Sequence, residues 1–277
     1  MAEDFLTQKS PPIDVQQQKG EALPRLVAIM QRLLAPDGCP WDREQTLESL
    51  RKYVLEEAAE VVDAIDDGDR EGLKEELGDL LLQIVFQSEL TRKENAFAID
   101  DVVHAICDKL VRRHPHVFGD ESAQNSKEVL ENWERLKAKE KVGRKLLDGV
   151  PRNLAALARA QAIGQKVARV GFDWPSIDGS RDKVTEEVRE LDAAIASGEK
   201  KAIEEELGDV LFALVNLARH LDIDAEAALR GTATKFTKRF HHVEDRITNE
   251  HGGFAKGPFA LDLLDRYWDE AKAKERA

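Results

Sequence analysis

Apolar side chains recur every three or four positions through much of the chain, which is the spacing that places them on one face of a helix. In residues 47–67 this stripe ends at the polar run 66–69, where Gly68 interrupts the helical pattern. The same spacing predicts further helices at 70–93, 99–113, 126–140, 180–197, 201–221, 224–247 and 260–275. No alternating pattern of useful strand length occurs, so the sequence predicts an all-α fold.

Two of these helical stretches carry the same pattern of acidic residues, shifted by 130 positions. Each reads E-x-x-E, then fifteen residues, then E-x-x-D. The acids are Glu57, Glu60, Glu76 and Asp79 in the first copy, and Glu187, Glu190, Glu206 and Asp209 in the second. A repeat on this scale indicates a duplicated structural unit.

The repeat extends beyond the acids. The basic segment KLVRRHPHV at 109–117 matches KFTKRFHHV at 235–243. A W-x-x-x-K-x-K-E pattern begins at Trp133 and again at Trp268. Each copy therefore has the same order of acids, basic helix and tryptophan segment.

A segment with two glycines and a proline, at 141–152, separates the copies. We therefore expect two tandem helical-bundle domains, at 21–140 and 153–277, joined by this linker. Residues 1–20 lack the basic and apolar regions of a signal peptide, and we expect a flexible tail there.

Composition excludes several classes of function. The formal net charge of −13 argues against nucleic acid as a partner, because sequence-independent binding needs a basic surface. No apolar run approaches the ~20 residues of a membrane span, so no membrane partner is expected. The two cysteines, Cys39 and Cys107, are too few for a disulfide framework. A soluble protein of the reducing cytoplasm is the interpretation that follows.

The acids have the spacing of a metal site. Residues three apart share a helix face, and fifteen residues between the pairs leave room for the chain to turn and return antiparallel. Four carboxylates brought together repel one another unless a cation neutralises them. Oxygen-only ligands favour Mg²⁺, with Mn²⁺ as a substitute, over the zinc and di-iron sites that histidine or cysteine would indicate.

Gly78 and Gly208 each lie within E-L-G-D, in the interior of an expected helix. Glycine there costs ~1 kcal/mol relative to alanine. Its presence at equivalent positions of both copies suggests the close approach of a neighbouring helix or of a ligand.

The combination of segments resembles the MazG-type, all-α nucleoside triphosphate pyrophosphohydrolases over roughly residues 22–275. The segments are CPWDREQT (39–46), LEEAAEVVDAI (55–65), EELGDLLLQIVF (75–86), RRHPHVF (112–118), GFDW (171–174), EEVREL (186–191), EELGDVLFALVNLARHL (205–221) and KFTKRF (235–240). The resemblance implies hydrolysis of a nucleoside triphosphate between the α- and β-phosphates. It also implies a homodimer.

For the second copy this resemblance implies the roles of individual residues. Glu187, Glu190, Glu206 and Asp209 are the expected Mg²⁺ ligands, with the first copy as a second, equivalent set. Glu186 or Glu205 is expected to orient the attacking water, and the choice between them stays open. The expected nucleotide contacts are Lys183, Lys235, Arg239 and Trp268.

Ordinary structural roles compete with these assignments. Lys183 and Glu187 have the spacing of a common helix ion pair. Lys235 and Arg239 can form a solvated face, and Trp268 can belong to a core.

The two copies differ at one position next to the acids. Lys183 corresponds to Tyr53, so the first copy lacks the lysine one turn before its metal ligands. All four acids remain in both copies. We therefore expect metal binding in both and catalysis in the second.

Three functions compete on this evidence. The first is an Mg²⁺-dependent pyrophosphohydrolase of broad base and sugar tolerance, with a dedicated dUTP or phosphoribosyl-ATP hydrolase as a variant. The second is a regulatory module that binds nucleotide or metal with little turnover. The third is an acidic structural protein, for which Mg²⁺ and a non-hydrolysable nucleotide would leave the melting temperature unchanged.

Overall fold

The computed structural model describes residues 22–125, 128–129, 132–133, 136–137, 143 and 145–275. The expected tail at 1–20 lies outside these residues. So does much of the helix expected at 126–140, including Lys139 and Glu140, and part of the expected linker. Every regular element in the described part of the chain is a helix, which confirms the all-α prediction.

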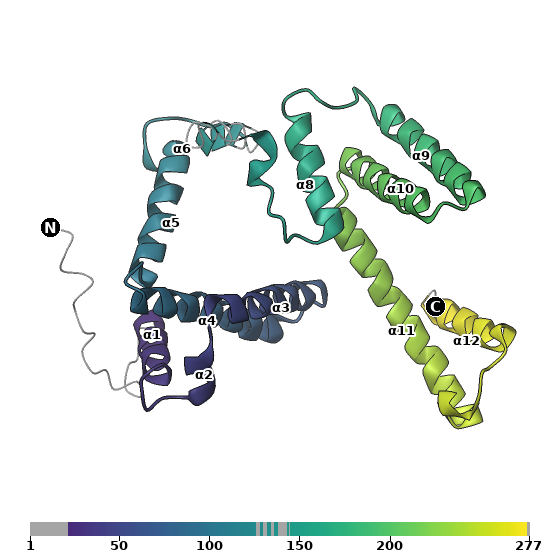
Figure 1. The fold of residues 1–277 in the computed structure, drawn as a ribbon, viewed down its shortest axis with the longest axis horizontal. Coiled ribbons are helices and arrows are strands. Elements are labelled where there is room, and N and C mark those ends of the chain that lie inside the picture. Colours follow the sequence, from purple (N-terminus) through teal and green to yellow (C-terminus); the bar gives the residue numbers. More distant parts are fainter. Residues whose placement is uncertain are drawn as a thin grey trace. The chain divides into compact units, whose positions relative to one another are not determined.

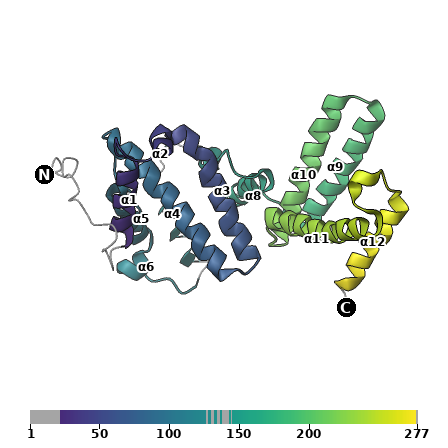
Figure 2. The ribbon, with the colours of Figure 1, turned by 90° about the horizontal axis from the view of Figure 1, so that it is seen from below.

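The chain separates into two compact units that divide between residues 142 and 143 (Figure 1). The division falls inside the expected linker, and the finer boundaries stay predictions. The described helices of the first unit are α1 (Ala22–Leu33), α2 (Pro40–Glu44), α3 (Leu47–Asp66), α4 (Arg70–Lys93), α5 (Ile99–Arg113) and α6 (Pro115–Phe118). Helices α3 and α4 form an antiparallel hairpin, against which α1 and α5 pack through α4 (Figure 2).

Capping residues fix this hairpin. At the start of α3, Thr46 and Ser49 form a reciprocal capping box, with Ser49 N donating to Thr46 Oγ1 at 3.2 Å. Gly68 follows α3 with φ +70°, a conformation that favours glycine. The carboxylate of Asp69 then accepts hydrogen bonds from the backbone N–H groups of Glu71 and Gly72 at the start of α4. The turn therefore brings the acids of α3 opposite those of α4.

The second unit repeats the hairpin. Its elements are η1 (Leu146–Gly149), α8 (Ala156–Ala168), α9 (Ile177–Ser197), α10 (Lys200–His220), α11 (Ala225–His251), η2 (Phe254–Lys256) and α12 (Leu261–Lys274). Gly198, with φ +73°, ends α9 in the left-handed conformation. Helices α9 and α10 pack along their length, α8 packs against α10, and α12 packs against α11.

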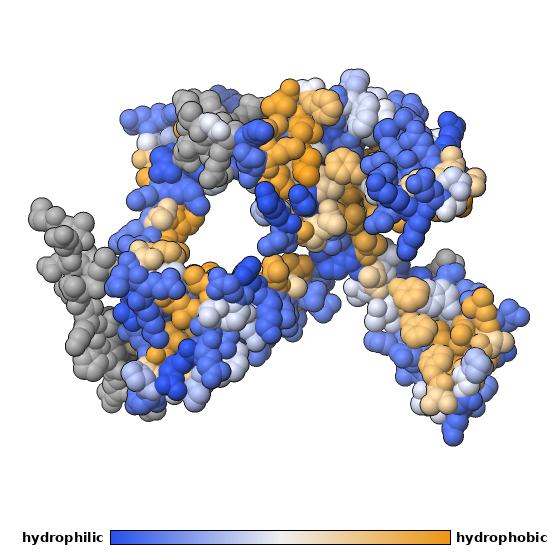
Figure 3. Space-filling model, in the orientation of Figure 1, coloured by the Kyte–Doolittle hydropathy of each residue, from blue (hydrophilic) through white to orange (hydrophobic). Residues whose placement is uncertain are grey.

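The buried apolar side chains are distributed differently in the two units. In the first, one cluster joins α1, α3, α4 and α5 through Met30, Leu34, Leu50, Val85, Phe86 and Ile99. In the second, a cluster of Val243, Ile247 and Tyr267 joins α11 to α12. Apolar side chains also lie on the surface over α8 and over the α11–α12 end (Figure 3). No helix in the described part of the chain is long and apolar enough to cross a membrane.

Among the described residues, no close approach occurs at Gly78 or Gly208. A Cβ atom added at either residue would meet nothing within 4 Å. No described helix therefore packs on these glycines, and the approach of a ligand stays a prediction.

Candidate active site

Three carboxylates converge on the α9–α10 hairpin. Glu187 and Glu190 lie one turn apart on α9, and Glu206 faces them from α10. One carboxylate oxygen from each lies within 4.8 Å of the others. Asp209, the fourth expected ligand, is one turn along α10 and lies outside this close group, which we call the second triad.

Like charges perturb the second triad. Partial desolvation, and then the charges of Glu187 and Glu186, raise the pKa of Glu190 above its ordinary value. Glu187 is only 5 % exposed. A buried carboxylate with acidic neighbours needs a compensating positive charge.

Lys183 supplies part of that charge. Its Nζ atom donates to Glu186 at 2.8 Å and lies 2.6 Å from a carboxylate oxygen of Glu187. Both hydrogen bonds raise the pKa of Lys183, and the one to Glu186 has the larger effect. Lys183 therefore forms the i,i+4 helix ion pair that its spacing allowed, next to the acids, and its contact with a nucleotide stays a prediction.

The first unit has a similar group of Glu57, Glu76 and Asp79, whose ligand atoms also lie within 4.8 Å of one another, and here it is Glu60, the counterpart of Glu190, that lies outside the close group. Desolvation, followed by the charges of Asp79 and Glu60, raises the pKa of Glu57. Tyr53 occupies the place of the lysine, and its ring meets Trp41 edge-on at 6.0 Å. We call these three acids the first triad.

Both triads offer the donors that a hard divalent cation prefers. All ligand atoms are carboxylate oxygens, and three protein ligands leave room in an octahedral shell for water or phosphate oxygens. The raised pKa values of Glu57 and Glu190 show the mutual repulsion that a cation would relieve.

The two water-orienting candidates differ in their surroundings. Glu186 is close enough to contribute to the raised pKa of Glu190. Glu205 instead pairs with Lys201 at 3.6 Å, and both side chains are exposed.

The remaining expected nucleotide contacts form a separate group on α11 and α12. Arg239 donates to Glu275, with Nη2 at 2.6 Å, and its guanidinium lies 5.7 Å from the ring centre of Trp268. The hydrogen bond from Arg239 lowers the pKa of Glu275 below its ordinary value. The charges of Lys238 and Lys235 lower this pKa further. Within α9 to α12 no hydrogen bond or ion pair links this basic group to the second triad. The structure therefore gathers the expected residues in two places.

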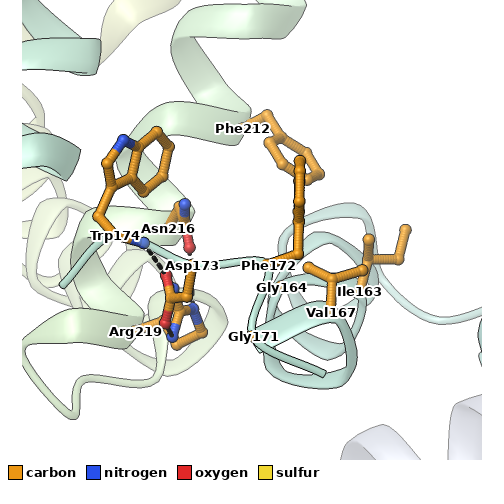
Figure 4. Close-up of a pocket in the computed structure, with 10 residues that line it drawn as sticks. All are labelled: Ile163, Gly164, Val167, Gly171, Phe172, Asp173, Trp174, Phe212, Asn216 and Arg219. Atoms are coloured by element: carbon orange, nitrogen blue, oxygen red, sulfur yellow. Dashed lines mark hydrogen bonds and ion pairs between the residues drawn. The ribbon is translucent and has the colours of Figure 1, made fainter. Parts of the chain in front are cut away.

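Sequence reasoning missed a pocket in the second unit. It has a volume of about 440 Å³ and is lined by α8, α10 and the segment 171–174. Figure 4 shows the Trp174 indole on one side, the rings of Phe172 and Phe212 on the other, and the Asn216 amide near Arg219. Phe172 and Trp174, close together in a chain with few aromatic residues, were the available signal.

Comparison with known proteins gives the same assignment as the acidic pattern. The MazG nucleotide pyrophosphohydrolase domain matches residues 45–118 and 178–244, so both hairpins fall within a match. The nucleoside triphosphate pyrophosphohydrolase of Escherichia coli (strain K12) is 48% identical over 257 residues, which cover 91% of this chain and 97% of that protein.

A relative from Thermotoga maritima, named nucleoside triphosphate pyrophosphohydrolase/pyrophosphatase MazG, is 43% identical over 249 residues. The aligned region covers 89% of this chain and 94% of that protein. Two matched domains and two near full-length relatives confirm the resemblance found in the sequence. The chain belongs to the MazG nucleotide pyrophosphohydrolase family.

Proposed function

We propose that this chain hydrolyses nucleoside triphosphates to nucleoside monophosphate and pyrophosphate, and that the second unit does so with Mg²⁺ held by Glu187, Glu190 and Glu206. The observation that carries this proposal is the second triad with Lys183 beside it. The names of the relatives from E. coli and T. maritima support the reaction.

Glu187, Glu190 and Glu206 would hold a divalent cation, which would supply Lewis-acid polarisation of the phosphate oxygens. Glu186 orients a water and accepts its proton as the water oxygen attacks the α-phosphorus. The bond from the α-phosphorus to the α,β-bridging oxygen then breaks, and pyrophosphate leaves. Lys183 offsets the negative charge that develops on the leaving group. Asp209, one turn along α10 from Glu206, would be the fourth carboxylate available to hold the cation.

We assign Glu186 rather than Glu205 to the water because of their neighbours. Glu186 acts on the pKa of Glu190, whereas Glu205 pairs with Lys201 on the exposed side of α10. Replacing Glu186 by Gln therefore lowers kcat strongly, and the same change at Glu205 has a small effect.

The basic group of Lys235, Arg239 and Trp268 reaches phosphate in a homodimer. Apolar side chains stay exposed along α10 and α11, namely Leu207, Leu211, Leu214, Phe236 and Phe240. A second copy that covers this stripe would bury it and bring basic residues to a site that the single chain leaves acidic. Sedimentation equilibrium tests the dimer, and replacing Leu211 by Glu is expected to yield monomers.

Product analysis tests the function directly. The chain is incubated with a panel of ribo- and deoxyribonucleoside triphosphates and Mg²⁺ or Mn²⁺, and the products are separated by ion exchange. Monophosphate and pyrophosphate in equal amounts are expected from several bases. Diphosphate and inorganic phosphate would contradict the bond assignment, and tight binding without any product would indicate the regulatory module.

A further inference from the structure

Helix α12 carries Trp268, one of the expected nucleotide contacts, and packs against α11 (Figure 1). The link between these two helices contains Gly252, Gly253 and Gly257, whose φ angles of +81°, +94° and +156° lie in the region that favours glycine. Because glycine has more accessible conformations than other residues, the backbone of this link leaves the direction of α12 open. Side-chain contacts between the two helices must therefore set how α12 is turned.

Tyr267 makes the most buried of these contacts. Its side chain is 0 % exposed and is the largest fully buried one in the described part of the chain. The ring belongs to one cluster with Val243 and Ile247 of α11, and the hydroxyl donates to a carboxylate oxygen of Glu250. Since the hydroxyl has one hydrogen, His251 Nε2, which lies 3.3 Å away, is left to donate to the hydroxyl oxygen. Packing therefore holds the ring, and two polar groups hold its hydroxyl.

Arg246 connects these polar groups. Its guanidinium lies 4.7 Å from the ring centre of Tyr267, and its Nη1 atom donates to Glu270 of α12 at 2.6 Å. Arg246 also pairs with Glu250 on its own helix. The hydrogen bond from Tyr267, followed by the one from Arg246, lowers the pKa of Glu250, so the acceptor stays ionised. We call Arg246, Glu250, Tyr267 and Glu270 the α12 anchor, because it ties two side chains of α12, one turn apart, to α11.

The α12 anchor does something that burial alone does not do. An apolar side chain at Tyr267 would bury a similar area without removing a hydroxyl from water. Apolar packing has no preferred direction, whereas a hydrogen bond needs a narrow range of angles. The bond between Tyr267 and Glu250 therefore fixes the rotation of α12 about its own axis.

This rotation decides where Trp268 lies. Trp268 follows Tyr267 and projects about 100° further round the helix. Its ring centre lies 4.8 Å from that of Phe236 and 5.7 Å from the guanidinium carbon of Arg239, both on α11. Turning α12 would carry Trp268 away from these residues. The contact that fixes the rotation is therefore also the contact that keeps Trp268 beside Arg239.

We propose that Tyr267 is a positioning residue for nucleotide binding, which acts by holding α12 so that Trp268 stays beside Arg239. Tyr267 touches no nucleotide itself, because its side chain is fully buried. The inference rests on the proposed function, in which Trp268 and Arg239 are nucleotide contacts. Since the acids and Lys183 lie on α9 and α10, the α12 anchor acts on KM and leaves kcat nearly unchanged.

Tyr267→Phe tests this role, because it keeps the buried ring and removes the hydroxyl. KM and kcat for ATP with Mg²⁺ are measured by pyrophosphate release for the full chain. We expect KM to rise about fivefold, as for the loss of one hydrogen bond, and kcat to change less than about twofold. A merely structural role gives the opposite result, because a smaller folded fraction lowers the apparent kcat and leaves KM unchanged. Tyr53→Phe, the same change at the other tyrosine of the chain, is the matched control and is expected to alter neither constant.

Two further variants probe the same contact from either side. Glu250→Ala removes the acceptor, and because the Glu250 side chain is 40 % exposed, this variant serves even where Tyr267→Phe is unstable. It is expected to raise KM as Tyr267→Phe does. Trp268→Leu is expected to raise KM by itself. In that background Tyr267→Phe is expected to add no further increase, since the residue that it positions is gone.

Three results would overturn the inference: an unchanged KM in a folded Tyr267→Phe or in Glu250→Ala, an unchanged KM in Trp268→Leu, or a full additional increase from Tyr267→Phe in the Trp268→Leu background. Each of them leaves the proposed function standing, because each is seen in an active enzyme. Failure of the proposed function shows itself differently, as no pyrophosphate from the wild type or as full turnover in Glu190→Gln. If the wild type is inactive, the calorimetric Kd for the α,β-methylene analogue of ATP replaces KM in the same comparisons.

Discussion

Beside the hairpin of the first unit, the space between α1 and α4 is filled by side chains. Phe86 is 3 % exposed in the buried cluster, and Glu89, also buried, accepts hydrogen bonds from Gln31 and Arg92. In the second unit the residues 130 positions later are Asn216 and Arg219, and they line a pocket instead. The same difference recurs at Tyr53, which packs on the first unit's core where Lys183 contacts acids in the second.

Both units carry the cluster of acids, but they differ in the residues around it. Both triads have the geometry and the repulsion of a cation site. Only the second has a lysine paired with its acids, and the second unit also holds a pocket between α8, α10 and residues 171–174. The first unit has a continuous core at the corresponding place, which favours a structural role with metal binding retained.

The largest expected effect comes from removing one acid of each unit in turn. Glu190→Gln is expected to lower kcat/KM about a hundredfold or more, because a metal ligand supplies several kcal/mol of transition-state stabilisation. Glu60→Gln, its counterpart in the first unit, is expected to leave turnover nearly unchanged. Pyrophosphate release with Mg²⁺ measures both. Loss of turnover in Glu60→Gln with retention in Glu190→Gln would reverse the assignment of the units.

Exchanging the residues at the core and pocket positions tests the packing difference. Phe86→Asn is expected to destabilise the first unit by about 3 kcal/mol or more, since it opens a cavity and buries an amide. Asn216→Phe is expected to change stability little, because the added ring enters an open pocket. Urea unfolding measures both effects. Equal destabilisation by both substitutions would mean that Asn216 is also a core residue.

Replacing Lys183 by tyrosine, the residue at the equivalent position of the first unit, tests the role of the lysine's positive charge. Lys183→Tyr is expected to lower kcat about tenfold, because a charge-assisted contact to the leaving phosphates is lost. Lys200→Tyr, on an exposed residue at the start of α10, is the control. A similar loss in both variants would assign Lys183 the role of an ordinary surface charge.

Sequence periodicity predicted the helices of both hairpins to within a few residues, because long amphipathic segments with clear stops carry their own signal. It missed α1 and α8, although both pack on the hairpins. It did not predict that Arg239 contacts Glu275 and the ring of Trp268, and the nucleotide contacts expected of Arg239 and Trp268 stay predictions. The position of a side chain relative to a distant helix depends on tertiary packing, which the spacing of residues does not carry.

The pocket between α8, α10 and residues 171–174 illustrates the same limit. Its walls come from three segments, and none carries a clear signal by itself: apolar residues of α8, the loop 171–174 with its two aromatic residues, and Phe212 and Asn216 on α10. Only the hydrogen bond from Arg219 gives the amide a direction, and that arginine is itself oriented from 46 positions away by Asp173. The pattern of acids, by contrast, is local to one hairpin, so the sequence alone was sufficient to find it.

The smallest expected effect concerns stability without metal. The raised pKa of Glu190 means that the folded state holds this proton more tightly than the unfolded chain, so stability falls as pH rises from about 4.5, the ordinary value, through the raised pKa. In EDTA, Glu190→Gln is therefore expected to raise the Tm at neutral pH and to have little effect below that window, where the wild-type group is already neutral. Added Mg²⁺ is expected to raise the Tm of the wild type more than that of the variant.

Glu57→Gln completes this comparison in the first unit, because the pKa of Glu57 is raised by the same causes. Its Tm in EDTA is expected to rise as it does for Glu190→Gln, while its turnover stays near the wild-type value. Matching stability effects with unequal activity would show that the two triads are electrostatically alike and that their neighbours, such as Lys183, make the difference in activity. If Glu57→Gln instead leaves the Tm unchanged in EDTA, the first triad does not experience the repulsion that its geometry indicates, and metal binding there loses its support.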